Sequence, residues 1–429
     1  MINRILGGIL LLPVLLLAGC GSPSQAAEST VPGTMSAPPC AAEPTEAPEP
    51  VSTPSPTPAP MPTPTPAPDP VAEALAAMTA EEKVGQLLAA GIEGAQPGED
   101  AAQAIRDYRV GGVILFGRNV ENAGQLVELT NGLKTLNGDC VPLFLCVDQE
   151  GGRVDRMPPE VERTPGAGQV GRSQNWEETG AAYGALLSAE CAAFGFNLNF
   201  APCLDIWSNP ENTVIGDRAF GGGWEIVSAF GRHAVRAMVE PGEVVPVVKH
   251  FPGHGDTSVD SHVDLPVVDK TVEELEKLEL LPFRAAIEAG APCVMAAHIL
   301  MTGIDPDLPA SLSPGVVTGL LRQELGFAGV VCTDDLTMGA ISDTYGMGEA
   351  AVLAVEAGCD LLLVCHGADN LTAAREALLA AVESGRISQD RLDESVYRLL
   401  SLKQEYGLTN DPVGQPDIDA LNAEIQALL

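Results

Sequence analysis

The feature that most constrains the fold is a repeated alternation, from about residue 71 onward, of short apolar runs and longer stretches with helical period. The runs lie at Gln86–Ile92, Gly112–Phe116, Leu143–Val147, Leu198–Leu204, Val244–Lys249, Cys293–His298, Gly329–Thr333 and Asp360–Cys365. Helical stretches between them include Trp176–Phe194, Val272–Ala289, Pro314–Glu324 and Gly348–Gly358. This alternation predicts an α/β fold with a parallel sheet. Eight units predict a single (β/α)8 TIM-like barrel. A doubly wound sheet is the alternative, although no glycine-rich phosphate loop follows the first run.

Charged residues recur where the apolar runs end. The residues at these ends are Asp148, Asp205, Lys249 with His250, His298, and Asp334 with Asp335. One acidic residue after a strand is ordinary N-capping of the next helix. Five such ends in one domain are better explained by an active site, because barrel enzymes place their chemistry at the carboxyl ends of the strands. The pattern therefore favours an enzyme over a structural domain.

The N-terminus has the features of a lipoprotein leader. Arg4 precedes an apolar run, Ile5–Leu17, which is too short to span a bilayer. The run ends in Leu17-Ala18-Gly19-Cys20, which resembles a bacterial lipobox. We therefore expect residues 1–20 to be a lipoprotein signal peptide, with Cys20 as the lipidated first residue of the mature chain. An ordinary signal peptide with an incidental cysteine is the alternative.

The remaining chain divides into a linker, a domain and a tail. Residues 21–70 hold 16 of the 35 prolines, which predicts a disordered, extended linker with no core. At roughly 3.1 Å per residue such a linker reaches on the order of 150 Å. Residues 71–409 are expected to form the catalytic barrel, and residues 410–429 a short tail with a helix at Asp417–Leu428. The predicted location is the extracytoplasmic face of the cell membrane.

The formal charge of −35 argues against nucleic acid and anionic membrane surfaces as partners. The ten cysteines include no C-x-x-C pair, so neither a zinc site nor a redox motif is expected. Most cysteines lie in apolar runs and are expected to be free thiols. Disulfides among Cys140, Cys146, Cys191 and Cys359 stay open, because export favours them.

The segment Lys249–His262, KHFPGHGDTSVDSH, holds three histidines and two aspartates. Its glycines and proline prevent a helix that would bring the histidines to one face, and Lys249 would repel a cation, so a metal site is disfavoured. His254 is interpreted as a structural residue in a tight turn. Asp260 and His262 are better read as a general acid/base pair, because a carboxylate orients an imidazole and raises its pKa.

A second candidate is Asp334, at the end of the run Val330–Thr333. A carboxylate at a strand end can act as the covalent nucleophile toward a sugar. Its neighbour Asp335 is then expected to face away, since adjacent strand residues point to opposite sides. Asp148, Arg156 and Arg218 supply polar groups suited to hydroxyls, although both arginines could instead hold loops by ion pairs.

Over residues 72–408 the sequence resembles glycoside hydrolase family 3, in its NagZ-type β-N-acetylhexosaminidase branch. The matching stretches are GGVILFGRN (111–119), VDQEGGRVDR (147–156), NFAPCLDI (199–206), VIGDRAF (214–220), KHFPGHGDTSVDSH (249–262) and VVCTDDLTMGAI (330–341). The 249–262 stretch is the most specific of these. The resemblance implies a retaining, exo-acting barrel enzyme that hydrolyses terminal β-linked N-acetylglucosamine.

By this resemblance Asp334 is the nucleophile and His262, oriented by Asp260, the general acid/base. Asp148, Arg156, Arg218, Lys249 and His250 match the positions that contact the sugar. The mechanism requires no metal and no cofactor, and a monomer is expected. Export shifts the expected substrate toward wall polymer, muropeptide or chitooligosaccharide. The alternatives are a phosphorylase of the same glycosides, since a histidine acid/base lets phosphate approach, a family 3 β-glucosidase, and a non-catalytic sugar-binding lipoprotein.

Overall fold

The computed structural model describes residues 69–257 and 265–428. Its centre is a closed barrel of eight parallel strands in the order β1-β10-β9-β7-β5-β4-β3-β2. The barrel strands are β1 (Leu88–Gly91), β2 (Gly112–Leu115), β3 (Phe144–Val147), β4 (Leu198–Asn199), β5 (Val245–Phe251), β7 (Cys293–Ala296), β9 (Val330–Asp335) and β10 (Leu361–Val364). Each of the eight predicted runs contributes one strand, so the predicted (β/α)8 barrel is confirmed.

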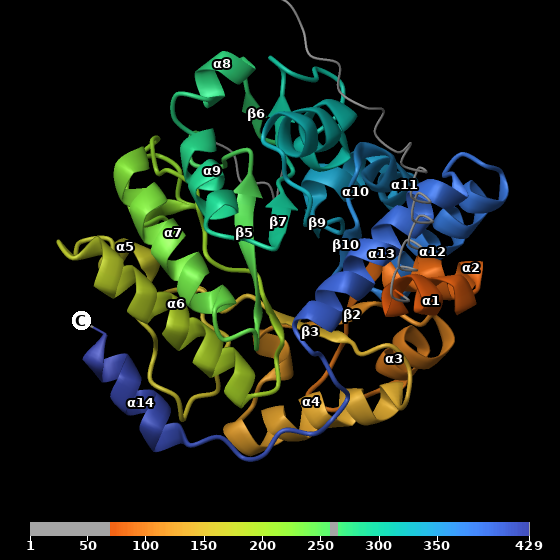
Figure 1. The fold of residues 1–429 in the computed structure, drawn as a ribbon, viewed down its shortest axis with the longest axis horizontal. Helices are drawn as coiled ribbons and strands as arrows, with labels where there is room; N and C mark the ends of the chain where they lie inside the picture. Colours follow the sequence, from red (N-terminus) through yellow and green to blue (C-terminus); the bar gives the residue numbers. More distant parts are fainter. Residues whose placement is uncertain (1–68, 258–264, 429) are drawn as a thin grey trace, which may run out of the picture. The chain divides into compact units, whose positions relative to one another are not determined.

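Helices surround the strands (Figure 1). The α-helices are α1 (Pro70–Ala77), α2 (Ala80–Gln86), α3 (Glu99–Ala102), α4 (Ala123–Asn137), α5 (Ala167–Val170), α6 (Trp176–Ala193), α7 (Trp224–Val239), α8 (Val272–Leu275), α9 (Leu280–Glu288), α10 (Gly339–Tyr345), α11 (Met347–Ala357), α12 (Ala368–Glu383), α13 (Gln389–Glu405) and α14 (Ile418–Ala427). Two π-helical segments, η1 (Gln103–Asp107) and η5 (Gly315–Glu324), and three 3-10 turns, η2 (Gly117–Asn119), η3 (Gly216–Arg218) and η4 (Ala310–Leu312), complete the set in the described residues. A small parallel sheet pairs β6 (Val267–Val268) with β8 (Leu300–Met301).

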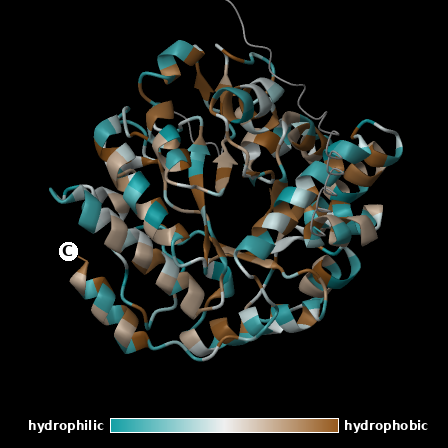
Figure 2. Cartoon of the chain, in the orientation of Figure 1, coloured by the Kyte–Doolittle hydropathy of each residue, from teal (hydrophilic) through white to brown (hydrophobic). Residues whose placement is uncertain are grey.

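The core follows from the composition of the strands. Barrel strands β1, β2, β3, β7 and β10 are built from glycine and apolar residues, and most of their side chains are buried. A parallel barrel buries both faces of its strands, because side chains fill the interior and helices cover the outside. Figure 2 accordingly shows strands at the centre that are mostly brown or pale, apart from the teal end of β5, and helices with mixed teal and brown faces.

Two element boundaries differ from those predicted. The run Leu198–Leu204 forms a continuous ladder only over Leu198–Asn199, and pairing resumes after Pro202 as a single bridge between Cys203 and Lys249. The stretch Val272–Ala289 is split into α8 and α9. Pro282 lies in the first turn of α9, the one part of a helix that tolerates proline, so the helix restarts just before it.

The predicted tail packs onto the barrel. Asn410 donates from its side chain to the Gly138 and Cys140 carbonyls at 2.8 and 3.0 Å. Val413 exchanges hydrogen bonds with the side chain of Asn131 on α4. Helix α14 matches the predicted helix to within one residue at each end, and Figure 1 shows it beside α6. Its buried Leu421 and Ile425 belong to the main core.

The described cysteines carry no disulfide. All eight of them are free thiols, which confirms the predicted thiol state for this part of the chain. Their burial raises the pKa of most of these thiols, including Cys191 and Cys332. Cys20 and Cys40 lie outside the described residues. Within residues 69–257 and 265–428, no helix combines the length and apolarity that a bilayer span requires.

Candidate active site

A polar pocket opens at the carboxyl ends of the barrel strands. Its free volume is about 210 Å³. It is bordered by Ile114, Phe116, Asp148, Glu150, Val154, Arg156, Arg218, Lys249, His250, Met295, Asp334, Asp335, Met338, Leu363, Cys365 and His366. Residues from six of the eight barrel strands or the segments just after them thus meet at one place, as expected for a barrel active site.

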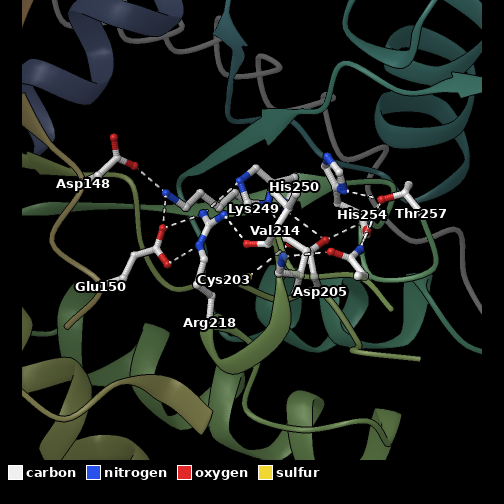
Figure 3. Close-up of polar contacts among 12 residues, drawn as sticks. Asp148, Glu150, Cys203, Asp205, Val214, Arg218, Lys249, His250, His254 and Thr257 are labelled. Atoms are coloured by element: carbon white, nitrogen blue, oxygen red, sulfur yellow. Dashed lines mark hydrogen bonds and ion pairs between the residues drawn. The ribbon is translucent and has the colours of Figure 1, made fainter. Parts of the chain in front are cut away.

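One wall of the pocket is an ion-pair network centred on Lys249 and Glu150 (Figure 3). The buried Lys249 Nζ lies 2.5 Å from Asp148 Oδ1 and 2.6 Å from Glu150 Oε1. Arg218 donates two hydrogen bonds to Glu150, from Nε at 2.9 Å and from Nη2 at 2.7 Å. The strand-end loop after β3, the residue Lys249 of β5 and the turn η3 are therefore held together by charge.

The charge state of Glu150 follows from these neighbours. Burial acts to raise its pKa, but Arg218 and Lys249 outweigh burial and hold the pKa of Glu150 well below its ordinary range. The same carboxylates raise the pKa of Lys249 against the opposing effect of burial. Glu150 and Lys249 are thus both charged at neutral pH and act as a fixed acceptor and a fixed donor beside the pocket.

Hydrogen bonds of the buried Gln149 also hold the loop after β3 in place. The buried Gln149 donates from Nε2 to Glu190 on α6 at 2.9 Å, and its Oε1 accepts the backbone N–H of Arg156 at 2.7 Å. Arg156 borders the pocket and forms no ion pair with any residue in the described ranges; its guanidinium reaches only the Asp155 carbonyl, at 3.4 Å. Of the two predicted arginines, Arg218 is therefore ion-paired, whereas Arg156 presents its charge to the pocket.

A second network orients His250. Asp205, which is fully buried, lies 2.6 Å from His250 Nδ1 and accepts the backbone N–H of His254 at 2.6 Å. His250 Nε2 lies 3.3 Å from Arg218 Nη2, which is always a donor. Nε2 therefore accepts from Arg218, and Nδ1–H donates to Asp205. His254 is buried and contacts Thr257 Oγ1 through Nδ1 at 2.9 Å, in agreement with the predicted structural role.

Cys203, Asp205 and His250 are close enough together to be considered as metal ligands, since one ligand atom from each lies within 4.8 Å of the others. These atoms already bond one another. Cys203 Sγ donates to Asp205 Oδ2 at 3.1 Å, and His250 Nδ1–H donates to the same carboxylate. A metal ion would have to displace both protons beside the Arg218 guanidinium. The cluster is therefore better described as a hydrogen-bonded support for His250.

Asp334 is the last residue but one of strand β9 and borders the pocket with a partly exposed side chain. Burial acts to raise its pKa, but His298, His250 and Lys249 together with the N–H of Asp335 lower the pKa of Asp334 below its ordinary value. Its Oδ1 accepts that N–H at 2.8 Å. Asp334 is therefore an ionised carboxylate with access to the pocket, as a nucleophile must be.

Asp335 also borders the pocket, so the expectation that it faces away from the site is wrong. Its carboxylate is nevertheless occupied: it accepts the N–H and hydroxyl of Thr337 at 2.9 and 2.6 Å and the Cys365 N–H at 3.1 Å. Its carbonyl contacts His298 Nε2 at 2.9 Å. Asp335 therefore ties β9 to β10, whereas Asp334 is left available.

The structure brings six of the predicted site residues to one pocket: Asp148, Arg156, Arg218, Lys249, His250 and Asp334. Asp260 and His262 lie outside the described residues, as does Cys20, so their roles stay predictions. Three further residues were given no specific role from the sequence. Glu150 lies two residues after Asp148, Asp205 follows an apolar run, and His366 follows the run that forms β10. In each case position after a strand was the available signal.

Comparison with known proteins identifies the family. The model of the glycosyl hydrolase family 3 N terminal domain matches residues 79–402, about three quarters of the chain. The chain belongs to glycoside hydrolase family 3. The predicted family is therefore confirmed, and the family 3 chain places its ionised carboxylate in the pocket expected of a barrel hydrolase.

Several relatives carry the name of the predicted branch. "Beta-hexosaminidase A" of Pseudoalteromonas piscicida is 34% identical over 76% of this chain and 60% of its own length. "Beta-hexosaminidase" of Nitrosomonas eutropha is 36% identical over 69% of this chain and 86% of its own. The solved structure of a family 3 β-N-acetylglucosaminidase from Paenibacillus sp. FPU-7 is 45% identical, with a TM-score of 0.77, over 82% of this chain and 68% of its own.

Proposed function

We propose that this family 3 chain is an exo-acting, retaining β-N-acetylglucosaminidase with Asp334 as nucleophile. The observation that carries the proposal is the position of Asp334, ionised and partly exposed, in a small polar pocket among charged residues that match the sugar-contacting motifs. The relatives named β-hexosaminidase and the β-N-acetylglucosaminidase structure support the same sugar class.

The charged residues that border the pocket suit a polyhydroxylated sugar ring. Asp148 and Glu150 offer acceptors, and Lys249, Arg218 and Arg156 offer donors, all around one space. Ion pairs fix all of these groups except Arg156 in place before a sugar enters, which lowers the cost of ordering them on binding. A volume of about 210 Å³ is below the roughly 300 Å³ at which drug-sized ligand pockets begin, and supports one terminal sugar rather than an internal segment of chain.

The proposed reaction has two steps. Asp334 attacks the anomeric carbon while His262, oriented by Asp260, protonates the leaving oxygen, so the glycosidic bond breaks and a covalent glycosyl-enzyme forms. Water, deprotonated by His262, then attacks the same carbon and releases both the sugar and Asp334. The roles of Asp260 and His262 rest on the motif resemblance.

The proposed setting is the outer face of a cell membrane, with the barrel held by a lipid on Cys20 and a proline-rich linker. N-acetylglucosamine-containing wall fragments or chitooligosaccharides are the substrates that such a position would reach. Labelling of the full chain with a radioactive or alkyne fatty acid tests the anchor: incorporation that disappears in Cys20→Ala is expected, and incorporation unaffected by that change would contradict it.

A chromogenic N-acetyl-β-glucosaminide tests the activity of the full chain. Turnover is expected in the wild type and is expected to fall roughly 10³-fold or more in Asp334→Asn, with Asp335→Asn retaining far more activity because Asp335 is a structural brace. Absence of turnover in the wild type, or an Asp334→Asn variant as active as the wild type, would favour a sugar-binding protein. Preference for the matched glucoside would favour a β-glucosidase.

Product analysis with and without inorganic phosphate separates hydrolysis from phosphorolysis. One structural neighbour, 26% identical with a TM-score of 0.74, is named a β-glucoside phosphorylase, so the acceptor needs a direct test. Free N-acetylglucosamine as the main product in both conditions is expected. A sugar 1-phosphate as the main product in phosphate would overturn the hydrolase assignment.

A further inference from the structure

All three tryptophans of this chain are exposed. Trp176, Trp207 and Trp224 expose 37%, 38% and 39% of their surface. Tryptophan is usually well buried on average because its large ring gains much from leaving water. The exposure of all three tryptophans therefore requires an explanation other than packing in the core.

The three rings lie on one part of the molecule. Trp176 and Trp224 are the first residues of the neighbouring helices α6 and α7, which pack against each other along their length. Trp207 lies in the segment after β4. Its backbone N–H donates to the Gly221 carbonyl at 3.0 Å, and Gly221 lies three residues before Trp224. The exposed aromatic rings are thus gathered near the start of α6 and α7, at the carboxyl end of the barrel.

A groove of about 570 Å³ lies among these segments, within the usual range of roughly 300–1,000 Å³ for ligand sites. Its lining includes Trp207, Phe220 and Ile226 on the apolar side and Gln169, Arg172 and Asp217 on the polar side. Half of the lining residues are glycines, namely Gly152, Gly166, Gly168, Gly171, Gly216, Gly221 and Gly222. We call this site the Trp207 groove.

The glycines explain the shape of the groove. A Cβ on Gly171 would lie 1.8 Å from the Phe220 carbonyl oxygen, so the turn after α5 can approach the segment before α7 only without a side chain. The result is a surface hollow whose floor is backbone. Backbone N–H and C=O groups beside an aromatic ring suit a ligand that has hydroxyl or amide groups around an apolar face.

The Trp207 groove shares a wall with the catalytic pocket. Within the segment 150–156, Glu150 and Arg156 border the pocket, whereas Gly152 borders the groove. Within η3 the same division holds, because Arg218 borders the pocket and Asp217 borders the groove. A chain whose end occupies the pocket can therefore continue across this wall onto the groove.

The charges favour a neutral occupant. The polar side of the groove has one cation, Arg172, and one anion, Asp217, and the protein as a whole carries a charge of −35. A polyanionic partner would be repelled by that field. A chain of β-linked N-acetylglucosamine is neutral, has an apolar face on each ring to stack on an indole, and has acetamido groups to bond backbone.

We propose that the Trp207 groove is a second glycan-binding site, which holds a β-linked N-acetylglucosamine chain several sugars away from the residue in the catalytic pocket. The proposal rests on the proposed function for its substrate class. It gives a role to Trp207, the one tryptophan in the lining of the groove: the groove retains polymeric substrate between cleavage events.

Intrinsic fluorescence provides a direct test, because no tryptophan borders the catalytic pocket. The full chain with Asp334→Asn, to prevent cleavage, is titrated with N-acetylglucosamine and with chitohexaose. A saturable change in tryptophan emission with chitohexaose but not with the monosaccharide is expected. The same emission with and without saturating chitohexaose would overturn the proposal.

Kinetics on otherwise wild-type protein separate this proposal from the catalytic one. Trp207→Ala is expected to raise the KM for chitohexaose about fivefold, as loss of one aromatic contact implies, and to leave the chromogenic monosaccharide substrate unchanged. Equal effects on both substrates would overturn the groove while leaving the proposed activity standing. If the wild type is inactive on both substrates, the proposed activity is overturned instead. The fluorescence titration then still tests whether the groove binds the glycan.

Two further variants exclude a structural explanation. Trp207 Nε1 donates to the Asn212 carbonyl at 3.1 Å, and Trp207→Phe removes that bond but keeps an aromatic ring. Retained chitohexaose affinity in Trp207→Phe supports stacking, whereas loss equal to that of Trp207→Ala contradicts it. Tyr397→Ala is the matched control, because Tyr397 is 40% exposed on α13, at the opposite end of the barrel. It is expected to leave both KM values unchanged.

Discussion

Glu150→Gln probes the ion-pair network most sharply, because it removes one charge and almost no volume. Glu150 is buried and is the shared acceptor for Arg218, at 2.7 and 2.9 Å, and for Lys249, at 2.6 Å. In the variant two buried cations face each other with only Asp148 left to balance them. An amide oxygen can still accept one hydrogen bond, but the amide nitrogen is a donor that meets other donors.

The magnitude follows from the burial of the pair. Removing one partner of a buried ion pair typically lowers the free energy of unfolding by about 3–5 kcal/mol. The retained hydrogen bond places this variant near 3 kcal/mol. For a unit of roughly 360 residues the entropy of unfolding is about 0.75 kcal/mol/K, so the expected decrease in Tm is about 4 °C. Turnover is expected to decrease as well, because Lys249 and Arg218 lose their common anchor.

Differential scanning calorimetry of Glu150→Gln and wild type at pH 7 measures the effect, with Glu128→Gln as the control. Glu128 is exposed on α4 and forms no ion pair with any described residue, so its substitution is expected to change Tm by less than about 1 °C. A Glu150→Gln variant with the Tm of wild type would refute the account of the network as a buried, mutually dependent ion pair.

The same network predicts a dependence on pH. The folded-state pKa of Glu150 is held below its ordinary value of 4.5, so its contribution to stability is complete above about pH 4.5 and is lost as the pH falls toward the folded-state pKa. The difference in stability between wild type and Glu150→Gln should therefore shrink on acidification below pH 4.5; a difference that stays constant to pH 3 would contradict it. Lys403 gives a slope of the same sign in a more alkaline range: it is buried on α13 against Gln86 and the Gly111 carbonyl, and burial lowers its pKa from 10.5 to about 7. The unfolded chain binds more protons between those values, so urea midpoints of wild type should rise from pH 7 toward pH 10, and Lys403→Met should remove that rise; parallel slopes would refute the assignment. Asp205→Asn should lower kcat/KM by up to roughly 100-fold, because His250 loses the acceptor that fixes its orientation. Cys203→Ser keeps a donor to Asp205 and should lower kcat/KM far less. Equal losses of kcat/KM in the two variants would contradict this role of Asp205.

The sequence predicted the architecture well because the strands of a parallel barrel are buried on both sides. Continuous apolar runs such as Leu143–Val147 and Asp360–Cys365 can form little else when helical stretches separate them. The site residues at the carboxyl ends of the strands could be predicted equally well, since Asp148, Lys249, His250 and Asp334 follow or end such runs. Parallel strands bring all of these ends to one face, so their convergence needed no further information.

What the sequence did not predict depends on contacts between distant residues. Glu150 and Arg218 are 68 positions apart, and nothing local to either residue indicates the bidentate pair. Asp205 and His250 are 45 positions apart, so the buried support of the histidine appeared only in the structure. The role of Asp335 was misread because alternation along a strand assigns facing directions only where the strand stays regular, and the pairing between β9 and β10 shifts register there.

The measurement that tests the central claim most directly is identification of the covalent intermediate. The full chain is incubated with a fluorinated N-acetylglucosaminide that forms the glycosyl-enzyme but turns over slowly, and the digested protein is analysed by mass spectrometry. The account predicts one sugar per chain, esterified to Asp334. A sugar on Asp335, Asp148 or any other residue, or rapid turnover of natural substrate with inversion and no adduct, would contradict it.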